Sequence, residues 1–406
     1  MIAAVVLAAA MIAPKQFTEL PLDAALQKAV AASPDVAQAR ERVEENAALL
    51  AAARGLGAPA LTANYTQAPQ GGSDNQTITQ RLTTVGAQIT LGDYLASAPA
   101  VRQAYFTLAG AQYDLADALR AERIKVSGQY YAALKAIATE ALRKQDVSGA
   151  SSDLRSAQLR FKAGDAPRLD VVRAQVALAS AQANLDAAHV DVQNTEQALA
   201  IETGQSDAVF ARLVSAPAQA APPAEVSRAV QRALAQRSDL LSAQQAVQAE
   251  QAAVRVAQRG IFPAVTISAG YTAGVDSGVN VRGPTANVNV AVPVSHASAD
   301  RVAAERARLE QALSKEEAIR RQIVVEVSAA ARTYAESWTA AQSAMRARVA
   351  AQEELRATQI GYRSGASTSL DVADARRTYV QAALAELNAV YAQAQAAATL
   401  EEELGP

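Results

Sequence analysis

Cysteine is absent from the 406 residues of this chain, and aromatic residues make up only 4% of it. Without cysteine there can be no disulfide, no thiol nucleophile, no thiolate metal site and no lipid attached through an N-terminal cysteine. With 5 Phe and 1 Trp, the composition is also unlike that of a core built around large side chains. Half of the residues are hydrophobic, and many of these are alanine. Long helices that pack closely through small residues fit this composition.

The sequence also lacks a large excess of charge of either sign. The 38 basic residues nearly cancel the 40 acidic ones, and the formal net charge is −2 at pH 7. Because nucleic-acid binding depends on clustered positive charge, no nucleic-acid partner is expected. The sequence shows no phosphate-binding loop and no nucleophile paired with a base. We therefore predict that the protein is not an enzyme, has no catalytic residues and uses no cofactor.

Metal-binding side chains are equally scarce. The only histidines are His189 and His296, which lie far apart in the sequence, and there are 3 Met. One falls on a predicted coiled-coil helix and the other follows a predicted strand, so both are interpreted as ordinary surface residues. No metal site is predicted.

Long hydrophobic runs are missing too. No segment approaches the roughly 20 continuous apolar residues of a membrane-spanning helix, so a protein of this sequence would have to cross a membrane as strands. Residues 1–13 form an alanine-rich apolar run, which we interpret as a signal segment with Ala8–Ala10 as its cleavage site. An N-terminal helical segment is the alternative, because the positively charged start of a typical signal is not there.

A tandem duplication is the clearest positive feature. Residues 161–171, FKAGDAPRLDV, recur 201 positions later as residues 362–372, YRSGASTSLDV. The match continues without a gap to Gly204 and Gly405. Repeats of this length are structural halves rather than small solenoid units.

Each half is expected to hold a short helix, a longer helix, two strands and a long helical hairpin, in that order. The fold class is therefore mainly α with a small β part. The predicted divisions are a first structural repeat at residues 14–215, with strands at about 58–92 and a hairpin at about 98–204, and a second repeat at residues 216–406, with strands at about 262–295 and a hairpin at about 296–404. A linker rich in proline and alanine joins them at residues 206–225.

The helices are predicted from composition and period. From about Ala98 to Lys162 the chain has no proline after Pro99, which predicts a helix roughly 95 Å long at 1.5 Å per residue. Its partner, from Pro167 to about Glu202, carries a coiled-coil seam of large apolar residues with a second row of alanines. The seam consists of Val171, Leu178, Leu185, Val192 and Leu199, with Ala174, Ala181 and Ala188. A similar seam is expected through Val327, Ala331, Tyr334, Trp338, Ala341 and Met345.

The strands are predicted from alternation of apolar with polar or small residues. The apolar series are Leu61, Ala63 and Tyr65; Val85, Ala87, Ile89 and Leu91; Val265, Ile267, Ala269 and Tyr271; and Val288, Val290, Val292 and Val294. Strands of about ten residues with this pattern fit the wall of a transmembrane barrel. Soluble hairpins that pack on helices are an equally good interpretation of the alternation alone.

Four strands per chain set a requirement on assembly if they lie in lipid. Backbone groups in lipid must all be hydrogen-bonded, so a sheet there has to close on itself. Barrels of this kind begin at about eight strands. Several copies of the chain would therefore have to share one barrel, with the long helices continuing the ring away from the membrane.

The duplicated motif carries a family resemblance. It reads Gly-x5-Asp-Val, with an aromatic residue three positions before the glycine, and it occurs at Gly164 and Gly365. Pro59 and Pro263 open the first strand in each half. With the two long helical hairpins, these features resemble the TolC-like outer-membrane efflux proteins over essentially the whole mature chain.

The resemblance implies a homotrimer in which four strands from each chain close a 12-stranded barrel in the lipid of the outer membrane of a Gram-negative bacterium. The helices would form a tunnel through the periplasm. The implied function is a channel, or exit duct, that works with a periplasmic adaptor protein and an inner-membrane transporter to export small molecules or proteins. The absence of cysteine implies a member without a lipid anchor. A periplasmic coiled-coil scaffold without a pore is the alternative function.

The resemblance also implies a periplasmic gate. Family members have a constriction at the positions of Asp371 and Asp374, where Asp170 and Tyr362 bond neighbouring helices together. The two first-named acids are three residues apart at a predicted helix start and share a face. In a trimer they would make two rings of carboxylates that attract cations. The alternative is that acids in a first helical turn only interact favourably with the helix dipole.

The turns of the two hairpins are the other candidate site. Gly164 and Gly365 are expected to adopt positive φ there, and in the family the same turns contact the adaptor. Arg168 and Ser367 lie beside them and belong to the same candidate contact. Some relatives carry a basic residue on the second hairpin where this chain has serine, and Arg168 on the first could substitute for it.

Overall fold

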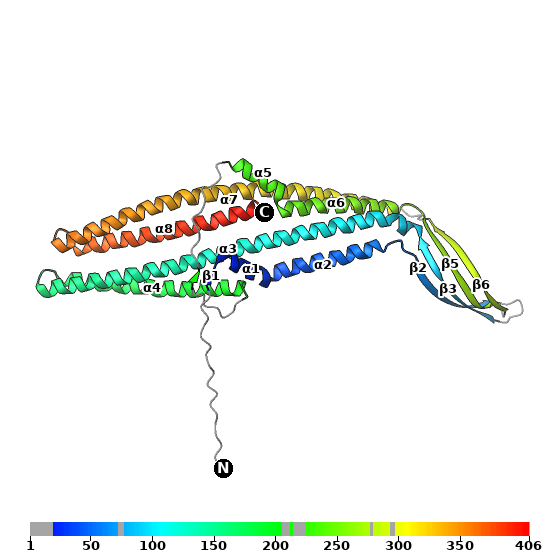
Figure 1. The fold of residues 1–406 in the computed structure, drawn as a ribbon, viewed down its shortest axis with the longest axis horizontal. Coiled ribbons are helices and arrows are strands. Elements are labelled where there is room, and N and C mark those ends of the chain that lie inside the picture. The colour runs from blue at the N-terminus through cyan, green and yellow to red at the C-terminus, as the bar shows by residue number, and fades with distance from the viewer. Residues whose placement is uncertain are drawn as a thin grey trace, which may run out of the picture. The chain divides into compact units, whose positions relative to one another are not determined.

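The computed structural model describes residues 19–71, 77–204, 212–213, 225–276, 279–292 and 297–405 (Figure 1). The predictions for the signal segment, for most of the linker, for Val294 and for His296 lie outside the described residues. The chain forms two compact units, and each takes segments from both halves of the sequence. Unit 1 comprises Met1–Ala37, Ala118–Gln236 and Val324–Pro406, and unit 2 comprises Gln38–Asp117 and Arg237–Ile323.

The fold is mainly helical with four long antiparallel strands, which confirms the predicted class. After β1 (Glu19–Leu20) come α1 (Leu22–Ala32), α2 (Pro34–Arg54), β2 (Ala60–Gly71), β3 (Thr77–Thr90), α3 (Leu91–Ala163) and α4 (Arg168–Glu202). After β4 (Arg212–Leu213) come α5 (Val226–Gln236), α6 (Ser238–Arg259), β5 (Ala264–Asp276), β6 (Val279–Ala291), α7 (Ala297–Ser364) and α8 (Ser369–Glu403). The second series repeats the order of the first. None of the helices in the described ranges combines the length and apolar character of a transmembrane helix.

The first long helix begins earlier than predicted. The sequence indicated a start near Ala98, but α3 begins at Leu91 and contains Pro99 in its interior. The prediction was wrong because Pro99 was taken to mark the first turn, where proline is most often found. A proline inside a helix removes one backbone hydrogen bond and its ring crowds the carbonyl four residues before it, but this 73-residue helix continues past Pro99. Leu91, predicted as the last strand position, is therefore the first helical residue.

The four long strands form one antiparallel sheet in unit 2, in the order β2-β3-β5-β6 (Figure 1). Its register places Ile89 opposite Ile267, and Ile267 opposite Val288. Because side chains alternate between faces along a strand, this register gathers the predicted apolar series on one face. The other face carries threonine, asparagine, serine and glycine, and Thr84 and Thr272 share a hydrogen bond of 2.7 Å there.

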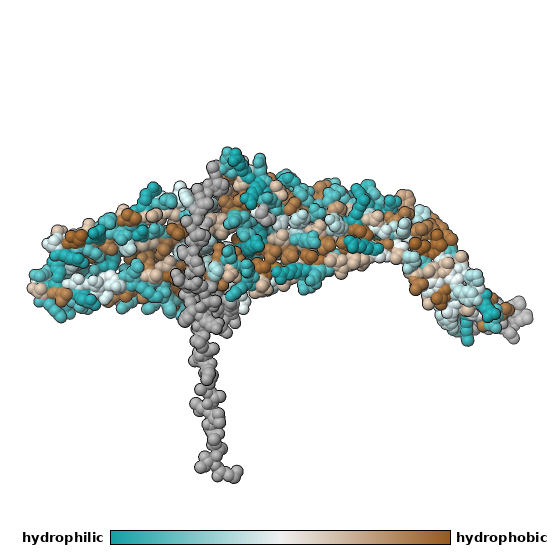
Figure 2. All heavy atoms as spheres, in the orientation of Figure 1, coloured by the Kyte–Doolittle hydropathy of each residue, from teal (hydrophilic) through white to brown (hydrophobic). Residues whose placement is uncertain are grey.

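The apolar face of the sheet is exposed in the single chain. Leu61 is 90% exposed and Val288 is 68% exposed. Figure 2 shows hydrophobic side chains gathered on the sheet where its strands adjoin the helices. An exposed apolar face of this kind is unusual for a protein surrounded by water and normally marks a surface that contacts lipid or another protein.

Unit 1 has its core where four helices and a short strand meet. The buried cluster consists of Leu20 from β1, Ala25 and Ala29 from α1, Val126, Tyr130, Tyr131, Ala133 and Leu134 from α3, Leu199 and Ala200 from α4, and Ala394 from α8. The Tyr130 hydroxyl donates a 2.8 Å hydrogen bond to the Leu20 carbonyl. The parallel pair β1–β4 was not predicted, because strands of two residues carry no alternation signal.

The predicted seam of α4 is confirmed. All its members are buried or half-buried, with Ala181, Ala188, Val192 and Leu199 fully buried. The seam of α7 is confirmed from Val327 to Ala341, but Met345 is exposed. Ala344, the residue before Met345, is half-buried instead. The buried face of the helix therefore steps from Ala341 to Ala344, three residues on, whereas the sequence predicted a step of four residues to Met345.

Candidate gate at the turns of the helical hairpins

The first helical hairpin consists of α3 and α4, and the second consists of α7 and α8. Both turns lie in unit 1 and have the same backbone. Gly164 has a φ of 80° and Gly365 a φ of 81°, which confirms the predicted left-handed conformation. A Cβ atom added at either glycine would meet nothing within 4 Å. The glycines are therefore needed for the backbone conformation alone, and the space beside both turns is open.

A matched pair of hydrogen bonds closes each of these turns. In the first, the Gly164 amide donates to the Phe161 carbonyl at 3.1 Å and the Asp165 amide donates to the Arg160 carbonyl at 2.9 Å. In the second hairpin, Gly365 donates to Tyr362 and Ala366 donates to Gly361. This is the Schellman arrangement, which satisfies the last carbonyl groups of a helix. The duplicated sequence thus encodes one turn twice.

The two hairpins differ in how their second helices begin. Helix α4 follows Pro167, whose side chain makes no capping hydrogen bond. Helix α8 begins with a capping box, in which the Asp371 amide donates to the Thr368 hydroxyl at 3.2 Å and the Thr368 amide donates to the Asp371 carboxylate at 2.7 Å. The hydrogen bonds from Thr368 hold the pKa of Asp371 below its ordinary value. Asp371 is therefore ionised at neutral pH.

Of the other acids of the candidate gate, Asp170 lies in the first turn of α4 and Asp374 in the second turn of α8. Asp374 forms an exposed ion pair of 3.1 Å with Arg377, one helical turn further along α8. Asp170 lies 4.0 Å from Arg173 on α4. Each carboxylate thus has a basic partner on its own helix. The Asp374 side chain is 53% exposed, whereas that of Asp170 is only 15% exposed. Of these two acids, only Asp374 is therefore freely accessible from the surface of the single chain.

Tyr362 is held by a residue that the sequence did not single out. The Arg160 guanidinium lies 4.5 Å from the centre of the Tyr362 ring and donates a 2.9 Å hydrogen bond to the Tyr362 carbonyl. The Tyr362 hydroxyl is buried and has no hydrogen-bond partner among the residues that the structure describes, so it is not bonded to Asp170 in this structure. The contact between the hairpins at this level therefore comes from an arginine of α3.

The residues beside the turns have different environments. Arg168 is the first residue of α4 and is exposed. Ser367 is half-buried, and its amide donates to the Gly361 carbonyl at 3.2 Å. A side chain at Gly361 would clash with the Ser367 hydroxyl. Ser367, in the turn between α7 and α8, thus folds back on the end of α7, whereas Arg168 is accessible.

His189 has an ordinary polar environment. Its Nδ1 atom lies 3.0 Å from a Glu140 carboxylate oxygen, and Glu140 also pairs with Lys144 at 2.8 Å. The hydrogen bond from Lys144, and then that from His189, holds the pKa of Glu140 below its ordinary value against the opposing effect of burial. Among the described residues there is no group of three or more His, Asp or Glu side chains that could hold a metal ion.

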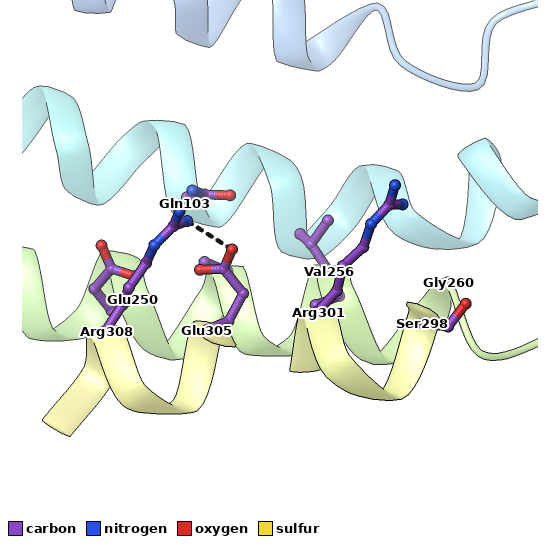
Figure 3. Close-up of a pocket in the computed structure, with 10 residues that line it drawn as sticks. Gln103, Glu250, Val256, Gly260, Ser298, Arg301, Glu305 and Arg308 are labelled. Carbon is purple, nitrogen blue, oxygen red and sulfur yellow. Dashed lines mark hydrogen bonds and ion pairs between the residues drawn. The ribbon is translucent and has the colours of Figure 1, made fainter. Parts of the chain in front are cut away.

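Unit 2 has a pocket between α3, α6 and α7 (Figure 3). Its lining includes two glutamates and two arginines, Glu250, Glu305, Arg301 and Arg308. Figure 3 shows Arg308 turned toward Glu305, and their charged atoms lie 2.7 Å apart. With balanced charge and one pair already formed on the same helix, the lining favours no particular ligand.

A family model described as outer membrane efflux protein matches residues 25–205 and 229–406. The chain belongs to the outer membrane efflux protein family. Membership places it in the bacterial outer membrane. Outer membrane efflux protein BepC of Brucella suis biovar 1 (strain 1330) is 26% identical over 263 residues, a match that covers 61% of this chain and 55% of that protein. The chain thus spans about half the length of this curated relative.

Solved structures show the same fold. The outer-membrane channel OprN has a TM-score of 0.81 at 19% identity, over 95% of this chain and 89% of that one. The CmeC outer membrane channel of Campylobacter jejuni has a TM-score of 0.77 at 16% identity, over 95% and 85% of the two chains. The outer membrane protein VceC of Vibrio cholerae has a TM-score of 0.77 at 19% identity, over 95% and 96%. Long helices with four antiparallel strands are thus the TolC-like channel fold.

Proposed function

We propose that the protein is a trimeric exit duct of the outer membrane, which works with a periplasmic adaptor and an inner-membrane transporter to export small molecules or proteins. The observation that carries the proposal is the sheet of unit 2. One face of this sheet is apolar and exposed, and the other is polar. Within the described residues its outer strands, β2 and β6, each pair with only one neighbour.

These properties favour a shared barrel. A sheet in lipid turns its apolar face to the acyl chains, and its polar face then lines an aqueous interior. The outer edges of β2 and β6 would leave backbone groups without partners, which lipid does not tolerate. Pairing β6 of one chain with β2 of the next removes both edges. Three chains, as in the family that this sequence resembles, supply enough strands to close.

The gate is proposed at the start of α8. Asp371 and Asp374 share one face, and the capping hydrogen bonds keep the first of them ionised. Around a threefold axis the two acids would form two stacked rings of negative charge. Such rings attract cations and disfavour anions. Asp170 and Tyr362 are proposed to lie beside this constriction, where Arg160 positions the tyrosine.

The turns at Gly164 and Gly365 are proposed as the adaptor contact, together with Arg168 and Ser367. The open space beside both glycines supports this role, since a partner can approach the backbone closely. Tryptophan at either glycine should therefore block docking, and alanine at the same position is the control for the strain that any side chain adds to the left-handed backbone. The expected result is loss of export in cells with normal amounts of trimer in the outer membrane. Unchanged export would show that the turns only connect helices.

The channel function is tested with the protein extracted from outer membranes in detergent. Its mass should correspond to three chains, and the same preparation should conduct ions in planar lipid bilayers. A well-folded monomer would contradict the shared barrel. A trimer that never conducts would instead support a scaffold without a pore.

A further inference from the structure

We propose that Arg376 is a positioning residue of the gate, because it fixes the start of α8 against α3 and so sets the direction in which Asp371 and Asp374 face. This inference rests on the proposed channel function. Both helices contribute to unit 1, where they run alongside each other (Figure 1).

The first observation is an ion pair between the two hairpins. The Nε and Nη2 atoms of Arg376 both lie 2.7 Å from one carboxylate oxygen of Asp153 on α3. The Arg376 side chain is only 15% exposed. Its planar guanidinium can hold a carboxylate with two donors at once, which a lysine cannot do. The pair therefore fixes a direction as well as a distance.

The second observation is a space on the surface of α3 that the Arg376 guanidinium fills. Gly149 lies on α3 between Asp146 and Asp153, and a Cβ atom added there would overlap the Arg376 guanidinium. Glycine inside a helix is unfavourable compared with alanine. At this position the glycine gives the arginine room to lie directly on the helix backbone.

The third observation is a second carboxylate at the same place. Asp146 lies seven residues before Asp153, on the same face of α3, and its charge also acts on Arg376. Burial raises the pKa of both carboxyl groups above the ordinary value, against the opposing effect of the arginine. Asp146 also lies 4.0 Å from Arg143 on its own helix, whereas the hydrogen bonds to Asp153 come from Arg376 on the other hairpin. The site is thus partly buried and holds two acids that both interact with Arg376.

The geometry of α8 connects this contact to the gate. Successive residues of a helix are rotated by about 100°, so Arg376 lies nearly opposite Asp374. The side chain of Asp374 is 53% exposed, whereas Val372 and Ala375 between the two sides are buried. Holding Arg376 on α3 therefore directs both gate acids away from α3. Loss of this contact should let the first turns of α8 rotate or separate.

Three variants test the inference in single-channel recordings of the detergent-extracted trimer. Arg376→Gln and Asp153→Asn each remove one partner of the ion pair, and Gly149→Ala displaces the arginine while both charges remain. Each should raise the open fraction about fivefold or more, the lower range for coupling of this kind. The exchange Arg376→Asp with Asp153→Arg should return the open fraction toward that of the unmodified channel.

Two controls separate positioning from general loss of stability. Gly110→Ala changes a glycine of α3 whose added Cβ would have only ordinary contacts, the nearest at 3.7 Å. Arg346→Gln removes an exposed arginine that hydrogen-bonds Ser343. Neither should change the open fraction. If the unmodified protein conducts but the three test variants behave like these controls, the inference is wrong and the channel function stands. If the unmodified protein does not conduct, the proposed function itself fails.

Discussion

At the scale of single residues, Asp371 has two separable properties. Its carboxylate completes the capping box of α8 through Thr368, and it also carries negative charge at the proposed gate. The hydrogen bonds from Thr368 lower its pKa in the folded state. The resulting stabilisation is fully present above the unfolded-state pKa of about 3.9 and is lost as pH falls through the folded-state pKa.

Thr368→Ala should therefore lower the free energy of unfolding by about 1 kcal/mol at pH 7. The difference from the unmodified protein should shrink in strong acid, where Asp371 is protonated. Thermal unfolding at pH 7 and in a series of increasingly acidic buffers measures both effects. Thr378→Ala is the matched control, because that hydroxyl only bonds the Asp374 carbonyl within α8. Equal losses for the two variants would contradict the capping role.

Tyr362 gives a second prediction at this scale. Its hydroxyl is buried without a partner, while Arg160 binds its ring and its carbonyl. Tyr362→Phe removes an unsatisfied polar group and should leave the thermal midpoint unchanged or slightly raised. Arg160→Gln should lower it, because the contact between the hairpins is lost. A lower midpoint for the phenylalanine variant would show that the hydroxyl has a partner in the assembled protein.

At the scale of elements, the sheet depends on two glycines that face each other. Gly86 of β3 pairs with Gly270 of β5. A Cβ atom at Gly86 would clash with the Ala269 carbonyl oxygen and lie 2.7 Å from the Gly270 Cα atom. The two central strands can approach this closely only because neither residue has a side chain.

Gly86→Ala should therefore weaken the pairing of β3 with β5 and reduce the yield of trimers that resist dissociation by detergent. Gly110→Ala in α3 is the control, since an added Cβ atom there would have only ordinary contacts, the nearest at 3.7 Å. Trimer yield on electrophoresis without heating measures the effect. A yield equal to that of the control would mean that β3 and β5 separate enough to accept a methyl group.

The two faces of β6 give another prediction. Val290 lies on the apolar face of the sheet and Asn289 on the polar face. If the apolar face contacts lipid, Val290→Arg should cost more than Asn289→Arg. Because Val290 is the next-to-last residue of β6, near the end that leads into α7, its cost should stay below the roughly 2–4 kcal/mol expected at the middle of the membrane. Folding into lipid vesicles measures the difference. Equal costs would contradict the assignment of the faces.

At the scale of the whole molecule, Asp371 and Asp374 of the three chains should form two rings of negative charge at the proposed gate. Asp371→Asn keeps a side chain that can accept the hydrogen bond from the Thr368 amide, so this change removes charge while the helix start is preserved. Combined with Asp374→Asn, it should reduce cation selectivity and weaken block by multivalent cations in bilayer recordings. Selectivity and block like those of the unmodified channel would place the constriction elsewhere.

The sequence by itself determined the class of the fold, the positions of the turns and the faces of the strands. Two glycines at matched positions mark the turns because only glycine adopts their φ at little cost. The faces follow from the alternation of side chains, since the register brings Ile89, Ile267 and Val288 side by side. The α4 seam was equally predictable, because a repeat of seven residues fixes one face of a helix.

Only the tertiary structure decided the contacts between the hairpins. Arg160 meets Tyr362 across 202 residues, and Arg376 meets Asp153 across 223. Nothing local distinguishes these arginines from the exposed arginines on the same helices, and Gly149 could not be connected with Arg376 before the helices were placed. Local sequence sets the period and the turns, whereas the partner of a side chain depends on which distant segment the fold brings beside it.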